Sequence, residues 1–213
     1  FHFSTNTDIR GELVQAIATE ITLQSNYLSG DLIETIYFGG GTPSVLSEQE
    51  IGLIMSRITQ HHSVSPDAEI TLEANPDDLS PGQLHKLKSL GINRLSIGIQ
   101  SFDDQLLAWL NRSHNGEAAV RSVMEAQQAG FSNISIDLIY AIPGLSASAW
   151  EDTIARAIAL NTPHLSAYTL TIEDKTTFGN WLKKGRLTPV DEATSATQME
   201  QLVSTLEAHG LRQ

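Results

Sequence analysis

The stretch IETIYFGGGTP, residues 33–43, decides the fold class of this chain. Its first six residues are mostly β-branched or aromatic, which favours a β-strand, and the glycines that follow end it. The same plan, an apolar segment that ends in polar residues before a helical pattern, recurs along the chain. The recurring segments are ITLEANP (70–76), RLSIGIQSF (94–102), ISIDLIY (134–140) and LSAYTLTIE (165–173). Strands that alternate with helices form parallel sheets, so the sequence predicts an α/β protein.

The predicted elements follow one another without a linker or a shift in composition, so residues 1–213 are interpreted as one domain. The right-handed crossover rule leaves two architectures, an open doubly wound sheet or part of a barrel. A helix comes before the first strand, which indicates that another strand precedes Phe1, and a partial (β/α)6 barrel fits that count. Strands are expected at 33–38, 69–74, 94–99, 133–139 and 164–170. Helices are expected at 9–28, 47–61, 80–91, 103–110, 117–129, 147–160, 177–184 and 191–209, with Asp8, Ser47 and Ser80 as N-caps.

Composition excludes several classes of function. The net charge is −12, which argues against a nucleic-acid partner because phosphates require clustered Lys and Arg. No apolar run approaches the ~20 residues of a membrane-spanning helix, so no integral membrane segment is expected. The chain has no cysteine, and therefore neither a disulfide nor a thiolate ligand. A cytoplasmic location is the default expectation.

Polar residues lie on one face of the expected strands. Because side chains alternate across a strand, Glu73, Gln100 and Asp137 are predicted to share a face and to point into the barrel. Unpaired carboxylates are costly to bury, so this pattern favours a polar lumen that binds a ligand. Ligand sites of such folds lie at the carboxyl ends of the strands. The alternative is that Glu73 and Asp137 bond loop backbone or pair with Arg94 or Arg112.

The glycine run Gly39-Gly40-Gly41 allows positive φ and a close approach of the backbone to a ligand. It is not a phosphate-binding loop, since the Gly-Lys-Ser/Thr ending is absent, and its spacing is not that of the dinucleotide fingerprint. No Gly-x-Ser-x-Gly elbow is present either, which argues against a serine hydrolase. Taken alone, the run is either a structural turn or a binding edge.

Five pieces of the sequence, in this order, resemble the oxygen-independent coproporphyrinogen III oxidase family of radical S-adenosylmethionine (SAM) proteins. They are YFGGGTPS (37–44), EANP (73–76), SIGIQSF (96–102), Asn111-Arg112 and DLIYAIP (137–143). The resemblance covers nearly the whole chain. It implies a partial (β/α)6 barrel, a 4Fe–4S cluster held by three cysteines, and SAM bound to the unique iron of that cluster. Reductive cleavage of SAM would then give a 5′-deoxyadenosyl radical.

The resemblance also implies which residues bind SAM. Gly40, Gly41 and Thr42 would meet its amino and carboxylate groups. The other SAM-contacting positions would be Glu73, Gln100, Arg112 and Asp137, with Thr171 on the adenine side. The chemistry suits these roles, because carboxylates accept from an ammonium or a diol and a guanidinium can fork onto a carboxylate. No metal ligand and no catalytic residue is assigned within the chain.

The family has two branches, oxidases that decarboxylate two propionates of coproporphyrinogen III and heme chaperones. The segment HLSAYTLTIE (164–173) and the start FHFST resemble the chaperone branch. That branch implies heme as a ligand and a heme-acceptor protein as a partner. The cluster cysteines are expected just upstream of Phe1, and a C-terminal domain of the family is expected beyond Gln213. Without its cluster the segment is expected not to cleave SAM.

Three further functions stay open at this point. One is the oxidase branch, with a porphyrinogen as substrate. The second is a non-redox (β/α) domain that binds a small metabolite in the same cleft. The third is acid–base catalysis by Glu73 and Asp137 as a carboxylate pair, which requires that one of the two pKa values be raised.

Overall fold

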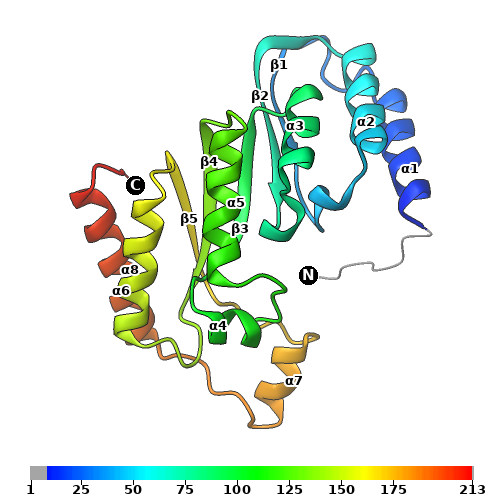
Figure 1. The fold of residues 1–213 in the computed structure, drawn as a ribbon. Coiled ribbons are helices and arrows are strands. Elements are labelled where there is room, and N and C mark those ends of the chain that lie inside the picture. Colours follow the sequence, from blue (N-terminus) through cyan, green and yellow to red (C-terminus); the bar gives the residue numbers. More distant parts are fainter. Residues whose placement is uncertain (1–8, 213) are drawn as a thin grey trace.

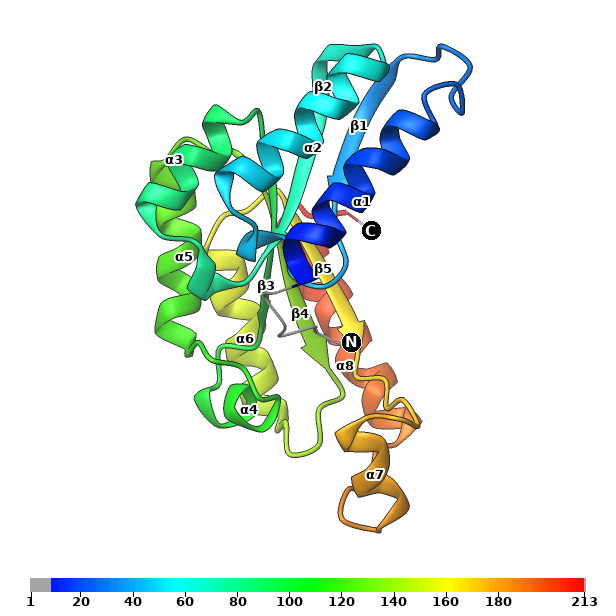
Figure 2. The ribbon, with the colours of Figure 1, turned by 90° about the vertical axis from the view of Figure 1, so that its right-hand side faces the viewer.

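A single parallel sheet organises the molecule, and it is seen in a computed structural model that describes residues 9–212 (Figure 1). The strands follow the order of the chain, β1-β2-β3-β4-β5, and every neighbouring pair is parallel. Figure 2 shows α3, α5 and α6 on one side of this sheet. The five strands therefore form an open half-barrel with helices outside, as the sequence predicts. The strands are β1 (Ile33–Phe38), β2 (Val64–Ala74), β3 (Arg94–Gln100), β4 (Asn133–Tyr140) and β5 (His164–Thr169).

The helices follow the predicted pattern closely. Ser47 and Glu50 form a complete capping box at the start of α2, and Ser80 caps α3, both as predicted. The longer helices are α1 (Arg10–Leu23), α2 (Glu48–His61), α3 (Pro81–Ser89), α5 (Gly116–Gln128), α6 (Ala147–Ala159) and α8 (Glu192–Ala208). Two short helices, α4 (Asp104–Trp109) and α7 (Thr177–Lys183), and two 3₁₀ turns, η2 (Pro43–Val45) and η3 (Pro76–Asp78), complete the fold.

Several predicted boundaries were wrong. The first helix ends at Leu23 rather than near residue 28, and its N-cap is Ile9; the predicted cap Asp8 lies outside the described residues. The second strand begins five residues early, at Val64 rather than at 69, because Pro66 and Asp67 sit in a register shift of the β1–β2 ladder. A proline is tolerated where a bulge interrupts the hydrogen bonds. Three strand ends each differ by one residue, with β3 ending at Gln100 rather than at 99, β4 at Tyr140 rather than at 139, and β5 at Thr169 rather than at 170.

The core lies between the sheet and its helices. It is built from the apolar side chains on the outer face of the strands, including Leu72, Ile97, Ile99, Ile136 and Leu138, all fully buried. The opposite face carries the polar set. This division fixes the position of the site, because only the inner face has side chains that can meet a polar ligand.

Candidate cofactor site

The glycine run after β1 forms the first wall of the site. Gly40 and Gly41 have φ values of +78° and +64°, a region that only glycine adopts without strain. Glu73, at the end of β2, holds this loop: the Gly40 N–H donates to its Oε2 (3.0 Å) and the Tyr37 hydroxyl donates to its Oε1 (2.9 Å). Thr42 precedes η2 and has no side-chain capping bond. The backbone-bonding alternative is therefore confirmed for Glu73.

The strand β3 ends in a bulge that sequence alternation did not predict. Ile97 pairs with Ile136, but Gln100 pairs with Leu138, so β3 has one extra residue there, and Gln100 adopts a φ of +69°. A side chain on Gly98 would place its Cβ 2.8 Å from Gln100 Nε2. Gln100 therefore folds back over Gly98, on the inner face, and the absence of a side chain at Gly98 makes room for it.

Arg112 reaches the same place from the loop between α4 and α5. Its Nη2 donates to Asn75 Oδ1 (2.7 Å) and to the Gly98 carbonyl (2.9 Å). Burial lowers the pKa of the guanidinium, and Asp77 and Asp78 oppose that change, so it stays charged. Neither Glu73 nor Asp137 pairs with Arg112. Two contacts on one nitrogen leave other guanidinium N–H groups able to bind an anion.

Asp137 lies just past the midpoint of β4, in the carboxyl half of its inner face. The Ser96 hydroxyl lies 3.2 Å from each of its carboxylate oxygens. Burial raises the pKa of Asp137 to about 6, hydrogen bonding from Ser96 opposes the rise, and the nearby charge of Glu73 adds to it. Burial also raises the pKa of Tyr37 to about 12, together with its hydrogen bond to Glu73. These groups influence one another's charge, so Tyr37, Glu73 and Asp137 lie in one neighbourhood.

Of the eight predicted site residues, Thr171 makes no hydrogen bond to any of the others. It is exposed, it follows β5, and its hydroxyl bonds only the Thr169 carbonyl (3.5 Å). Its neighbours Leu170 and Ile172 line a cavity of about 420 Å³ between the ends of β4 and β5 and the start of α8. Helix α8 was not predicted to contribute to a site, and nothing in its amphipathic pattern signals one.

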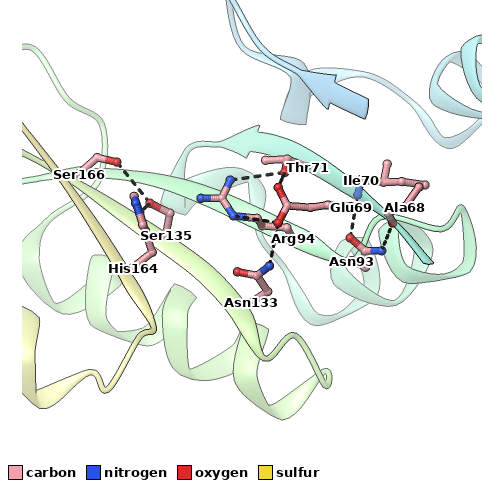
Figure 3. A network of polar contacts seen from close by, with 10 residues as sticks. All are labelled: Ala68, Glu69, Ile70, Thr71, Asn93, Arg94, Asn133, Ser135, His164 and Ser166. Atoms are coloured by element: carbon pink, nitrogen blue, oxygen red, sulfur yellow. Dashed lines mark hydrogen bonds and ion pairs between the residues drawn. The ribbon is translucent and has the colours of Figure 1, made fainter. Parts of the chain in front are cut away.

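The amino half of the inner face holds a different polar network (Figure 3). Arg94 Nη1 donates to Thr71 Oγ1 (3.4 Å), and its Nε lies 3.9 Å from Glu69 Oε2, which also accepts from Asn133 (3.1 Å). Arg94 therefore pairs with Glu69, and not with Glu73 or Asp137. On β4 and β5, Ser135 Oγ lies 2.8 Å from His164 Nδ1. Sequence reasoning missed this network. Its members lie on the same face as the predicted site, nearer to the amino ends of the strands.

Neither a metal nor a membrane site is indicated in residues 9–212. No group of three or more His, Asp or Glu side chains in this part of the chain could hold a metal ion. Within the same residues, no helix combines the length and the apolar character that crossing a bilayer requires. The groups at the carboxyl end are backbone N–H and guanidinium donors, carboxylate acceptors and an amide that can do both, and this set suits a small zwitterionic ligand.

The comparisons with known proteins decide the family. The sequence profile described as the radical SAM superfamily matches residues 10–157. This chain belongs to the radical SAM superfamily. That result confirms the resemblance drawn from the motifs, and the members of this superfamily use SAM and a 4Fe–4S cluster.

Relatives place the chain in the heme chaperone-like branch of the coproporphyrinogen oxidase family. The heme chaperone HemW of Bacillus subtilis is 41% identical over 182 residues, which cover 85% of this chain and 48% of the relative. The heme chaperone HemW of Escherichia coli is 36% identical over 169 residues, covering 79% and 45%. The chain thus spans about half the length of these relatives.

Solved structures support the fold. The coproporphyrinogen III oxidase of Escherichia coli, described as a radical SAM enzyme, superposes with a TM-score of 0.85 at 24% identity, covering 97% of this chain and 48% of that one. An Elp3 protein of Methanocaldococcus infernus gives a TM-score of 0.73 at 16% identity, covering 88% and 50%. At these identities the likeness establishes the architecture, a partial radical SAM barrel, and no shared activity.

Proposed function

We propose that this chain is the SAM-binding core of a heme chaperone. The proposal is supported chiefly by the glycine loop, Gln100, Arg112 and Asp137, which come from the carboxyl halves of successive strands and the loops after them, in a half-barrel whose family uses SAM. When bound, the 4Fe–4S cluster supplies the electron for reductive cleavage of SAM. The residues of this chain bind and orient SAM beside it.

Each group of SAM finds a complementary partner in this arrangement. The Gly40 and Gly41 backbone and Thr42 would meet the methionine ammonium and carboxylate. Arg112 would place its free N–H groups on the carboxylate. Gln100 lies beside Arg112 and can donate or accept. Glu73 would act mainly by shaping the glycine loop, because both its oxygens already accept hydrogen bonds.

Asp137 is the strongest candidate for a direct contact on the inner face. Its oxygens accept at a relatively long 3.2 Å from Ser96, which leaves capacity for a ribose diol or an ammonium. Thr171 would lie on the adenine side, next to the cavity at the end of β5. These assignments also account for the acidic groups without acid–base catalysis, because the Glu73 carboxylate is engaged by the loop.

Heme handling is inferred from the relatives, whose names describe them as heme chaperones. The test uses the complete protein with its cluster reconstituted under anaerobic conditions. We expect SAM to bind to the cluster and change its electron paramagnetic resonance spectrum. We also expect heme to bind and coproporphyrinogen III to remain unchanged. Steady formation of protoporphyrinogen would instead assign the protein to the oxidase branch.

A cluster spectrum that does not change on addition of SAM would contradict the proposal that this chain binds SAM. Such a result, together with tight binding of another metabolite, would favour the non-redox alternative. Transfer of bound heme to an acceptor protein is the expected last step. It is tested by mixing the heme-loaded protein with candidate apoproteins and following the heme absorbance.

A further inference from the structure

A single carboxylate, Asp78, connects the two walls of the candidate site. It lies in the turn η3 (Pro76–Asp78), next to the site but not among the residues assigned to contact SAM. Its Oδ2 accepts a hydrogen bond from Ser44 Oγ (2.6 Å). Ser44 is 4% exposed and belongs to η2, directly after the glycine loop. Asp78 therefore holds the exit of that loop through Ser44.

The same oxygen of Asp78 also leads to Arg112, through Asn75. Asn75 Nδ2 lies 3.5 Å from Asp78 Oδ2, and Asn75 Oδ1 accepts from Arg112 Nη2 (2.7 Å). Because a carboxylate only accepts hydrogen bonds, it attracts the NH₂ end of the amide and leaves the oxygen end for Arg112. The orientation of the Asn75 amide, and with it one contact of the guanidinium, thus depends on the charge of Asp78.

The backbone links the same groups a second time. The Asn75 N–H donates to Ser44 Oγ (3.3 Å), and the Asp78 N–H donates to the Asn75 carbonyl (3.1 Å). The negative charge of Asp78 also acts on Arg112 directly, favouring its charged form. A hydrogen-bonded chain therefore runs from the glycine loop through Ser44, Asp78 and Asn75 to Arg112.

We propose that Asp78 is a positioning residue that sets the glycine loop and Arg112 together, against opposite sides of the amino-acid part of SAM. This inference rests on the proposed function, since it takes SAM as the ligand. It adds residues that the family motifs did not assign to the site, namely Ser44, Asn75 and Asp78. Its specific content is that two contact groups which do not touch each other are coupled through one carboxylate.

The first test is Asp78→Asn in the complete protein with its reconstituted cluster. This change keeps the shape but removes the charge and lets the side chain donate, so Asn75 loses its fixed orientation. We expect SAM to bind about tenfold more weakly by calorimetry, the scale of one lost charge-assisted hydrogen bond. The matched control is Asp67→Asn, an exposed position on the same strand-and-turn segment, which should change affinity less than about twofold.

The second test separates positioning from simple loss of structure. Ser44→Ala and Arg112→Lys should each weaken SAM binding, and the double variant should lose less than the product of the two effects. In the Asp78→Asn background the same two changes should become independent. Independent effects in the native background, or unchanged SAM affinity in a folded Asp78→Asn protein, would overturn the proposal. Should Asp78→Asn fail to fold, the Ser44–Arg112 cycle alone decides the question.

A third measurement does not need SAM. Hydrogen exchange of the ligand-free protein should show faster exchange in Asp78→Asn at residues 39–42 and at residues 111–115 together, with the core strands unchanged. Faster exchange in one segment only would contradict the coupling. If the native protein failed to bind SAM, the proposed function would fall, whereas this measurement would still decide whether Asp78 links the two segments.

Discussion

The two ends of the sheet's inner face carry similar polar residues and use them differently. At the amino end, Glu69, Arg94 and Asn133 bond one another, and Ser135 bonds His164 (Figure 3). At the carboxyl end, Asp137 has only serine hydroxyls as close partners among the described residues. Arg112 donates to two acceptors from a single nitrogen, Nη2. A polar inner face is therefore not by itself evidence of a ligand-binding site. Remaining hydrogen-bonding capacity distinguishes the proposed binding end, at the carboxyl ends of the strands, from the structural end, at their amino ends.

The largest expected effect lies at the structural end. Asn93 donates to the Ala68 carbonyl and accepts from the Ile70 N–H, both at 2.8 Å, so its side chain completes the ladder where β3 begins. Asn93→Ala leaves two partly buried backbone groups unpaired and should lower the free energy of unfolding by about 2–4 kcal/mol. Urea denaturation measures the loss, and the exposed Asn26→Ala serves as control. A loss of SAM affinity in the folded variant would contradict the assignment of Asn93 to a purely structural end of the sheet.

The second prediction concerns the binding end. Arg112→Ala should weaken SAM binding by about 2–3 kcal/mol, because a charge-assisted contact to the ligand carboxylate is lost. Calorimetry on the reconstituted complete protein gives this value. Arg94→Ala is the matched control, because it removes a guanidinium from the same inner face, and it should affect stability but not the affinity of the folded protein. Equal affinity losses in both variants would contradict the account.

The third prediction uses pH. The pKa of Asp137 rises from an ordinary value of 3.8 to about 6 in the folded protein, chiefly through burial. Stability is therefore lost as the pH rises from about 4 to about 6, because the unfolded state releases this proton before the folded state does, and the full cost is present above about pH 6. The cost is absent only below about pH 3, where folded and unfolded states both hold the proton. Allowing for partial exposure, Asp137→Asn should be about 1–2 kcal/mol more stable than the native protein at pH 8 and equally stable at about pH 3.

The same pKa shift predicts a pH dependence of binding. If the ionised form of Asp137 accepts hydrogen bonds from SAM, affinity is complete above pH 6 and declines as the pH falls through about 6. Asp137→Asn should bind weakly without this step. Thermal unfolding and SAM titrations at several pH values report the two effects separately. A wild-type affinity that is flat from pH 5 to 8 would remove Asp137 from the ligand contacts.

The smallest expected effect is at Gly98. An alanine there would place its Cβ 2.8 Å from Gln100 Nε2 and 3.5 Å from Arg112 Nη2. The flexible end of Gln100 can move away at little cost, so stability should change by less than about 1 kcal/mol. SAM affinity should fall by up to about tenfold, because the Gln100 amide is displaced while Arg112, at an ordinary contact distance, stays in place. Gly82→Ala, an alanine substitution in open space on α3, is the control.

The sequence predicted the elements well because their signals are local. The capping box at Ser47 and the cap at Ser80 require only a few neighbouring residues, and the strands were found by their apolar runs. The same alternation put Glu73 and Asp137 on the inner face. The start of β2 was missed because Pro66 and the bulge beside it depend on the partner strand.

The missing parts of the site have the same origin. The bulge at Gln100 depends on the pairing of β3 with β4, and the alternation of polar and apolar residues along β3 does not reveal it. The pairing of Arg94 with Glu69 and the chain from Ser44 through Asp78 to Arg112 join residues more than twenty positions apart. Such contacts depend on tertiary register, so a single sequence suggests candidates for a site without giving their partners.

The central claim is that SAM binds at the carboxyl end of the inner face. Calorimetric SAM titration of the reconstituted complete protein, side by side for Asp137→Ala and Ser135→Ala on the same strand, tests it most directly. We expect Asp137→Ala to weaken binding by about 1–3 kcal/mol and Ser135→Ala to leave the affinity of the folded protein unchanged. Unchanged affinity in Asp137→Ala, or an equal loss in Ser135→Ala, would contradict the claim.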